Sequence, residues 1–175
     1  MSRYRGVKVS DKVSRIVVGS DHGGFRLKEE LKAYLEKKGY RVKDVGCFNP
    51  APCDYPQFAY EVARQVSIGK FQRGILICKS GIGNSIVANK LKRVRAALCY
   101  NLKAAKLSRR HNDANLLVLG ALFVKEALAK RMVSLWLKTE FEGGRHLRRV
   151  RQIGRIDHVI NAKIKMQKPK RQCKI

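Results

Sequence analysis

Short apolar runs alternate with amphipathic stretches along most of the chain. The runs are rich in Val, Ile and Leu, which predicts buried strands, and the stretches between them carry apolar residues at helical spacing. The expected strands are 14–19, 40–45, 74–78, 95–99 and 115–119, and the expected helices are 25–38, 57–68, 84–91, 102–109 and 124–138. This alternation predicts an α/β fold in which a five-stranded parallel sheet has helices on both faces. Three of the four prolines fall in 47–56, which predicts a loop there.

The last part of the chain has a different composition. Residues 144–175 contain eleven Lys or Arg and one acidic residue, Asp157. Apolar residues at helical spacing from Leu147 to about Ile164 predict a helix, which is followed by a polar basic tail. Basic arms of this kind often become ordered on a polyanion. The expected parts of the chain are a basic N-terminal arm (1–13), a central domain (14–150), and a basic C-terminal helix and tail (151–175).

The charge of the chain is unusual for a protein of 175 residues. Thirty-nine Lys and Arg against thirteen Asp and Glu give a net charge of +26 and a pI of about 10.4. Such a field attracts polyanions, chiefly nucleic acid and also anionic membranes, although a solvated basic surface without a dedicated partner has the same composition. Apolar residues make up 45%, enough for a hydrophobic core, which excludes a globally disordered protein.

The apolar runs and the cysteines bear on where the protein acts. No apolar run is long enough to span a bilayer, so we expect no membrane partner. The basic start of the chain lacks the apolar segment of a signal peptide. The five cysteines have irregular spacing and no CxxC motif, which disfavours a disulfide framework or a structural zinc site and favours a reducing compartment. We expect a cytoplasmic protein, with a mitochondrial one as the alternative.

Candidate chemistry follows the strands, because ligands of parallel α/β sheets bind at the carboxyl ends of the strands. Cys78 ends the third strand and is followed by glycines and a helix, a setting that predicts a lowered thiol pKa and a role as base or nucleophile. The alternative is a plain core cysteine. Asp21 and His22 follow the first strand, where they would bind sugar hydroxyls or cap the next helix.

Further candidates lie nearer the C-terminus. His111, just before the fifth strand, is either an acid–base group or a turn residue. Arg145, Arg148 and Arg149 have guanidinium groups that fit phosphate oxygens, or they belong to the general basic surface. Taken one by one, each of these residues is consistent with a catalytic or binding role and equally with a structural one.

Taken together, these segments resemble a known family. The matching stretches cover about 14–150 and are GSDHGGF (19–25), DYP (54–56), GILICKSGIGNSIVANK (74–90), RAALC (95–99), RRHNDANLLVLGA (109–121) and TEFEGGRHLRRV (139–150). They are similar to the type B ribose-5-phosphate isomerases and the related galactose-6-phosphate isomerase subunits. The resemblance implies a Rossmann-like sheet and a homodimer or tetramer in which two subunits share each active site. It also implies an aldose–ketose isomerisation of a sugar phosphate through an enediolate, without a metal or an organic cofactor.

The resemblance implies roles for individual residues as well. Cys78 would be the base that moves a proton between C2 and C1, and His111 from the partner subunit would open the furanose ring. Ser80 would hold the enediolate oxyanion together with backbone N–H groups of the glycine loop. The substrate-binding residues would be Asp21, His22 and Asn112 at the sugar, Lys79, Gly81, Ile82 and Gly83 in the loop, and Arg145 and Arg149 at the phosphate.

Three positions depart from the family pattern. Lys79 stands where the family usually has Gly, and its side chain either crowds the ligand loop or adds a favourable charge. Leu122 stands where the family commonly has an Arg on the phosphate, and losing one charged hydrogen bond costs on the order of 1.5–3 kcal/mol. Asn84 stands where the family usually has an apolar residue.

The sequence therefore leaves two compatible functions open. The first is a sugar-phosphate isomerase that acts on ribose 5-phosphate in carbohydrate metabolism, as in the pentose phosphate pathway, and the retained site residues favour it. The second is a repurposed isomerase fold that binds RNA, for example as a component of an organellar ribosome such as the mitochondrial one. The charge of +26, the basic arms and Leu122 favour this second function.

Overall fold

The computed structural model describes residues 14–166, and it describes side chains from 14 to 156. The expected N-terminal arm (1–13) and the end of the expected tail (167–175) lie outside the described residues. The strands are β1 (Arg15–Ser20), β2 (Arg41–Asp44), β3 (Arg73–Cys78), β4 (Ala96–Leu98) and β5 (Leu116–Gly120). The helices are α1 (Phe25–Lys37), α2 (Tyr55–Ser67), α3 (Ile82–Ala88), α4 (Leu102–Asn112), α5 (Glu126–Lys138) and α6 (Gly144–Met166).

The five strands are all parallel and lie in the order β2-β1-β3-β5-β4. The chain passes from β1 outward to β2 and then returns to the other side of β1 to form β3, so the direction of winding reverses between β1 and β3. In open α/β sheets the carboxyl ends of the strands at such a point form the ligand-binding crevice. The predicted Rossmann-like parallel sheet is confirmed, and the loops after β1 and β3 lie where a ligand is expected.

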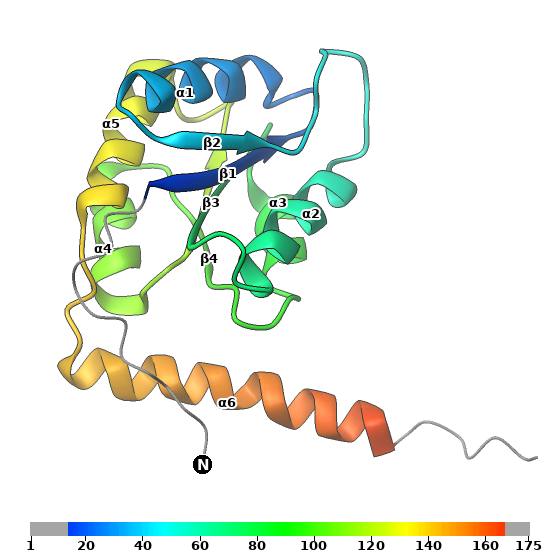
Figure 1. Cartoon of the computed structure of the whole chain (residues 1–175), viewed down its shortest axis with the longest axis vertical. Helices are drawn as coiled ribbons and strands as arrows, with labels where there is room; N and C mark the ends of the chain where they lie inside the picture. Colours follow the sequence, from blue (N-terminus) through cyan, green and yellow to red (C-terminus); the bar gives the residue numbers. More distant parts are fainter. Residues whose placement is uncertain (1–13, 167–175) are drawn as a thin grey trace, which may run out of the picture.

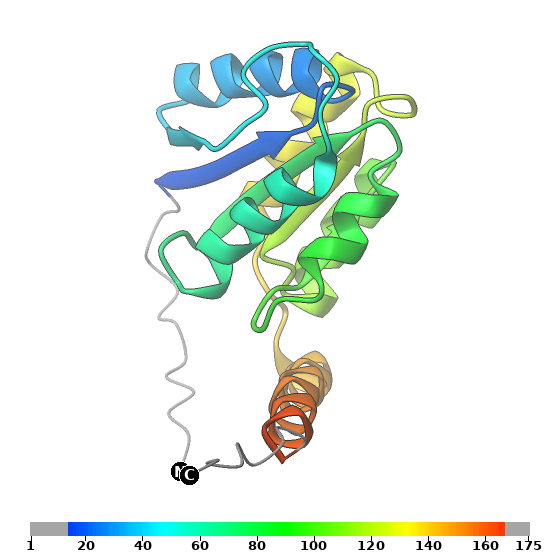
Figure 2. The ribbon, with the colours of Figure 1, turned by 90° about the vertical axis from the view of Figure 1, so that its right-hand side faces the viewer.

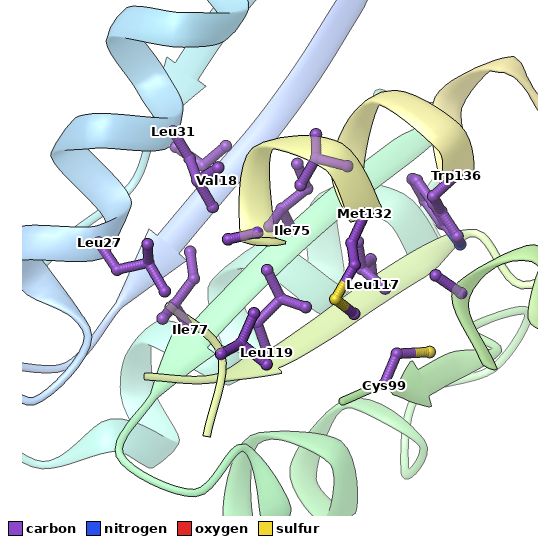
Figure 3. Close-up of a cluster of buried hydrophobic side chains, with 14 of the residues drawn as sticks. Val18, Leu27, Leu31, Ile75, Ile77, Cys99, Leu117, Leu119, Met132 and Trp136 are labelled. Carbon is purple, nitrogen blue, oxygen red and sulfur yellow. The ribbon is translucent and has the colours of Figure 1, made fainter. Parts of the chain in front are cut away.

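Helices cover both faces of this sheet (Figure 1). Neighbouring residues of a strand point to opposite faces, so that Ile75 and Ile77 join one hydrophobic cluster and Leu76 joins the other. The first cluster packs α1, α4 and α5 against the sheet, and Figure 3 shows Leu31 of α1 and Met132 of α5 within it. The second cluster packs α2 and α3 against the other face. Burial of both faces explains why the strands read as continuous apolar runs rather than as alternating ones.

The start of α2 differs from the sequence prediction for a local reason. The helix begins at Tyr55, inside the expected loop 47–56. Pro56 fits the first turn of a helix, where its missing N–H removes no hydrogen bond and its fixed φ suits the helix. Pro56, which the sequence predicts to lie in a loop, therefore marks the start of a helix.

The ends of the next two helices also differ. α3 spans Ile82–Ala88 rather than 84–91, because the side chain of Asn89 bonds to the backbone N–H and C=O of Ala96 at 2.9 Å each and so ends the helix. α4 continues three residues beyond 109 and ends at Asp113, which adopts the left-handed conformation. His111 and Asn112 therefore lie in the last turn of a helix and not in a separate turn. α5 begins two residues later than predicted.

α6 is one continuous helix, so the boundary expected between 150 and 151 lies within a single element. It packs against α4, and Figures 1 and 2 show it at the bottom of the molecule, on the side where the strands begin. Val150 is buried there, whereas Ile153 and Ile156 are 43% and 57% exposed. Within residues 14–166, none of the helices is long and apolar enough to cross a membrane.

Candidate active site

The loops that follow β1 and β3 lie against each other at the carboxyl edge of the sheet. Asp21 is buried, and its Oδ1 accepts the N–H of Gly24 at 2.9 Å, which holds the turn before α1. A Cβ atom on Gly23 would lie 2.5 Å from Cγ of Lys79, so the Lys79 side chain passes directly over the β1 loop. Lys79 is itself exposed and covers this part of the edge with a positive charge. The structure therefore brings two of the candidate segments together.

Cys78 ends β3 with its thiol enclosed by the loop that follows. The N–H of Gly81 donates to its Sγ at 3.0 Å. Burial raises the pKa of the Cys78 thiol, backbone N–H groups of the loop lower it, and the nearby Asp21 carboxylate raises it, so that the net direction is upward. The prediction of a lowered pKa is therefore wrong for the single chain, because burial of the strand end outweighs the N–H groups around the sulfur.

The glycine loop uses much of its own hydrogen-bonding capacity. The N–H of Ile82 donates to Oγ of Ser80 at 3.2 Å, and the N–H of Gly81 is bonded to the thiol. The hydroxyl of Tyr100 donates to the carbonyl oxygen of Ser80 at 3.0 Å, which fixes the loop from the outside. Gly81 has a φ of +83°, a conformation that other residues rarely adopt. The oxyanion is expected to be held by the N–H groups of residues 81–83, and those of Gly81 and Ile82 therefore have partners within the loop.

Asn84 lies in the first turn of α3 and is 1% exposed. Neither Oδ1 nor Nδ2 of its side chain has a hydrogen-bond partner among the described residues. A buried polar atom without a partner costs about 1–3 kcal/mol. Asn84 thus lowers stability close to the Cys78 thiol, toward which its backbone N–H is directed.

His22 is half-buried and is held by the loop between β2 and α2. The N–H of Cys53 donates to Nδ1 of His22 at 3.2 Å, and the N–H of His22 donates to Sγ of Cys53 at 3.2 Å. The ring is therefore fixed through Nδ1, and Nε2 is the nitrogen left for a ligand. The helix-capping alternative is wrong for both residues, because α1 has Gly24 as its N-cap and no side-chain cap hydrogen bond; Asp21 instead holds the turn that precedes the helix.

The remaining candidates lie at the opposite edge of the sheet. α4 runs from the end of β4 back to the start of β5, so its last turn, with His111 and Asn112, lies at the amino edge. Within one chain the candidates therefore form two groups, each named here for its edge. The carboxyl-edge group is Asp21, His22, Cys78, Lys79, Ser80, Gly81, Ile82 and Gly83. The amino-edge group is His111 and Asn112 of α4 with Arg145 and Arg149 of α6.

The ring of His111 is stacked on that of His146 in α6. The ring centroids are 4.2 Å apart and the ring planes differ by 4°. Glu142 lies beside both rings, with one carboxylate oxygen 3.9 Å from Nε2 of His111 and the other 3.9 Å from Nε2 of His146. Burial lowers the pKa of His146, and His111 and Arg145 lower it further, so the stack favours a neutral His146.

These three side chains also form the one group of possible metal ligands found among the described residues, with ligand atoms within 4.8 Å of one another. The nitrogen lone pairs of two stacked imidazoles lie in parallel planes, so they do not converge on a single point as metal ligands must. The arrangement fits an oriented acid–base histidine better than a metal centre.

The end of α4 is held by a buried arginine. Arg109 is 3% exposed, and its guanidinium donates to the carboxylate of Asp113 and to the carbonyl oxygen of Ala114, both at 2.7 Å. Arg95 donates to the other carboxylate oxygen of Asp113 at 2.7 Å. Asp113 therefore joins two arginines directly after His111 and Asn112, and it fixes the position of that turn.

A family model described as Ribose/Galactose Isomerase matches residues 16–153. The chain belongs to the ribose/galactose isomerase family. It is therefore an enzyme of the aldose–ketose isomerase class. Ribose-5-phosphate isomerase B of Escherichia coli is 44% identical over 145 residues, which are 83% of this chain and 97% of that protein. D-erythrulose-4-phosphate isomerase of Pectobacterium atrosepticum is 40% identical over 145 residues, 82% of this chain and 95% of that protein.

Solved structures in the ribose/galactose isomerase family agree with this assignment. Ribose-5-phosphate isomerase B of Clostridium thermocellum is 49% identical and superposes with a TM-score of 0.82, covering 83% of this chain and 99% of that one. The resemblance inferred from the sequence is therefore confirmed at the level of the family and the fold.

Several residues that shape the site were missed from the sequence. The Tyr55 ring lies against Gly83, where an added Cβ would be 2.5 Å from the ring, and Tyr100 holds the Ser80 carbonyl. Tyr55 lies in a stretch that matches the family, but nothing in the stretch says what the ring contacts. Cys53 pairs with His22 across 31 residues, which no local pattern predicts.

Proposed function

We propose that this member of the ribose/galactose isomerase family interconverts ribose 5-phosphate and ribulose 5-phosphate, with Cys78 as the base. The observation that carries the proposal is the carboxyl-edge group. A thiol at the end of β3, where the winding of the sheet reverses, is close enough to Asp21 to feel its charge, and the Lys79 side chain that follows it passes over the loop that holds Asp21 and His22. A sugar bound between these loops would meet a base, a carboxylate and an imidazole at once.

In this mechanism the thiolate of Cys78 takes a proton from C2 of the open-chain aldose and returns it to C1. The negative charge that develops on the oxygen is stabilised by the Ser80 hydroxyl and by loop N–H groups that exchange their present bonds for the oxyanion. Asp21 and Nε2 of His22 bind sugar hydroxyls. The raised pKa of the Cys78 thiol makes it a stronger base once it is ionised.

A second chain would complete the site. His111, with Arg145 and Arg149, lies at the opposite edge from Cys78 in its own chain, so these residues serve a Cys78 site only from a partner subunit. The proposal is a homodimer, or a tetramer of such dimers, in which the amino-edge group of one subunit faces the carboxyl-edge group of the other. The stacked and oriented His111 would then open the sugar ring, and the two arginines would hold the phosphate.

The test of the base is a comparison of two cysteine variants. Cys78→Ala should lower kcat/KM for ribose 5-phosphate by at least about a hundredfold, the usual contribution of a general base. Cys99→Ala changes a cysteine buried in the hydrophobic cluster and should leave turnover close to that of the unchanged protein. Absence of turnover by the unchanged protein with pentose, tetrose and hexose phosphates would overturn the proposal. If kcat/KM were higher with erythrulose 4-phosphate than with ribose 5-phosphate, the proposed substrate would be wrong, but the proposed mechanism with Cys78 as the base would stand.

Shared sites have a separate test by subunit mixing. Cys78→Ala and His111→Ala should each be inactive alone. When they are unfolded, mixed in equal amounts and refolded, half of the dimers contain one of each subunit, and each of these has one intact site. The mixture should regain about a quarter of the unchanged activity. No recovery, with dimers present by ultracentrifugation, would show that each site belongs to one chain.

A second candidate function is binding to the phosphate backbone of RNA. The comparisons give it no support, and among the described residues the charge of α6 favours it. The five arginines Arg145, Arg148, Arg149, Arg151 and Arg155 are exposed on this helix, and in the described part of the chain no carboxylate lies within salt-bridge distance of them. Unpaired cations along one helix attract a polyanion and release its counterions.

The test of RNA binding uses one face of α6. Arg148, Arg151 and Arg155 line a common surface hollow and lie outside the amino-edge group. Changing all three to Gln should weaken binding to a structured RNA and reduce its salt dependence, while ribose 5-phosphate turnover is unchanged. A matched control changes Lys37, Lys38 and Lys43 to Gln, away from α6. Weak or salt-independent binding by the unchanged protein would remove this function.

A further inference from the structure

The loop between β2 and α2 brings two thiols together beside His22. Sγ of Cys53 lies 3.4 Å from Sγ of Cys47, and both cysteines are free thiols. The sulfur atoms of a disulfide are about 2.05 Å apart. A small movement of either side chain would therefore bring the two sulfur atoms to bonding distance. Cys47 is 4% exposed, whereas Cys53 is half-buried and is the more accessible of the two.

Cys53 is also a partner of His22 through both its backbone and its side chain. Its Sγ accepts the N–H of His22 at 3.2 Å, and its own N–H lies 3.2 Å from Nδ1 of the His22 ring. The carbonyl oxygen of Cys53 is 3.1 Å from the same Nδ1. Any displacement of Cys53 therefore changes the position of the imidazole at the carboxyl edge.

We propose that Cys47 and Cys53 are a reversible redox modification site, and that their disulfide withdraws Cys53 from His22. Its effect on turnover rests on the isomerase function proposed above, whereas formation of the bond does not. In the bond the Cys53 sulfur moves toward Cys47 and no longer accepts the N–H of His22. The backbone of His22 then loses a hydrogen bond, and displacement of Cys53 shifts the backbone N–H that holds Nδ1 of the imidazole.

The chemistry balances with glutathione disulfide as the oxidant. The Cys53 thiolate attacks one sulfur of glutathione disulfide and releases one glutathione thiolate, which forms a mixed disulfide on Cys53. The Cys47 thiolate then attacks the Cys53 sulfur, forms the intramolecular disulfide and releases the second glutathione. Two protein thiols lose two protons and two electrons, and one glutathione disulfide becomes two glutathione thiols.

The surroundings of Cys53 predict how the reaction depends on pH. Burial raises the pKa of the Cys53 thiol, the contact with Cys47 raises it further, and the N–H of His22 lowers it. The attacking thiolate is therefore a minor species at neutral pH, and oxidation should accelerate as the pH rises. Asp21 also raises this pKa, which ties the reactivity of the pair to the carboxyl-edge group.

The bond can be detected without any activity assay. The full chain is reduced, desalted and incubated with glutathione disulfide, and free thiols are then alkylated before tryptic digestion. Residues 44–64 contain no Lys or Arg before Arg64, so both cysteines lie in one tryptic peptide. The peptide should be lighter than its reduced form by two hydrogen atoms and should not be alkylated. A peptide 44–64 that stays reduced, or that carries glutathione on Cys53, would overturn the proposal.

The effect on His22 is tested with a serine variant of the buried cysteine. Oxidation should lower the kcat/KM of the unchanged protein by roughly tenfold, the value of one lost hydrogen bond, and dithiothreitol should restore it. Cys47→Ser keeps a hydroxyl that donates to the Asn49 carbonyl, as the thiol does, but cannot form the internal bond. It should keep its activity in the oxidant as long as peptide mass shows no glutathione on Cys53. Equal loss in Cys47→Ser, with no glutathione on Cys53 in its peptide 44–64, would assign the inactivation to another thiol such as Cys78 and overturn the proposed link to His22. A reduced protein without turnover would refute the isomerase function, while the peptide mass would still decide the bond.

Discussion

Replacing Asp113 by Asn removes the carboxylate that joins Arg109 and Arg95 at the end of α4. The variant keeps the size of the side chain, and Asn also tolerates the left-handed conformation in which Asp113 has a φ of +47°. The change is therefore one of charge and not of backbone geometry. It tests whether a buried guanidinium needs this carboxylate to hold the turn that follows His111.

The expected loss follows from the burial of the partners. The Arg109 side chain is 4% exposed, and those of Arg95 and Asp113 are 19% and 31% exposed. Removing one member of a buried ion pair costs about 3–5 kcal/mol, and partial exposure together with the carbonyl acceptors that Arg109 keeps places the value near the lower limit. We expect a loss of about 3 kcal/mol in the free energy of unfolding, or about 6–12 °C in Tm.

The measurement is urea unfolding at neutral pH, followed by circular dichroism and analysed at constant m. Glu126→Gln is the matched control, because it breaks the exposed pair with Lys130 on α5 and should leave the midpoint close to that of the unchanged protein. If Asp113→Asn unfolds at the same urea concentration as Glu126→Gln, the carboxylate does not stabilise the buried arginine and the reasoning fails.

Three further predictions concern the carboxyl edge. Leu122→Arg should lower KM for ribose 5-phosphate by about tenfold. The backbone N–H of Leu122 bonds to the Lys79 carbonyl, so an Arg side chain at this position would lie beside the ligand loop. An unchanged KM would show that position 122 does not contact the phosphate. Alkylation of Cys78 by iodoacetamide, followed by peptide mass spectrometry, should be slow at neutral pH and accelerate well into the alkaline range, because burial raises the pKa of the thiol; a rate that is already maximal at neutral pH contradicts this. Asn84→Leu should raise the free energy of unfolding, measured by urea denaturation, by about 1–2 kcal/mol, since it removes two buried polar atoms without partners. A lower free energy of unfolding would show instead that ordered water satisfies these two atoms.

The sequence by itself determined the elements and the family. The continuous apolar runs identify the five strands. Such runs are expected because helices cover both faces of the sheet, so that neighbouring residues of a strand do not alternate between apolar and polar. Helix ends were less predictable, since they depend on contacts made across the fold. Asn89 ends α3 by pairing with Ala96, and the buried Arg109 fixes the end of α4 through Asp113. The matching motifs indicated the family because they carry residue identity, which needs no coordinates.

Only the tertiary structure decided how the candidate residues are divided in space. Sequence motifs do not show that Cys78 and His111 lie at opposite edges of the sheet, because that follows from the direction in which α4 returns along the strands. The sign of the Cys78 pKa shift also required the structure, since burial competes with N–H groups and the balance depends on depth. The Cys47–Cys53 contact beside His22 arises where a loop folds back on the β1 turn, and a spacing of six residues does not predict that contact.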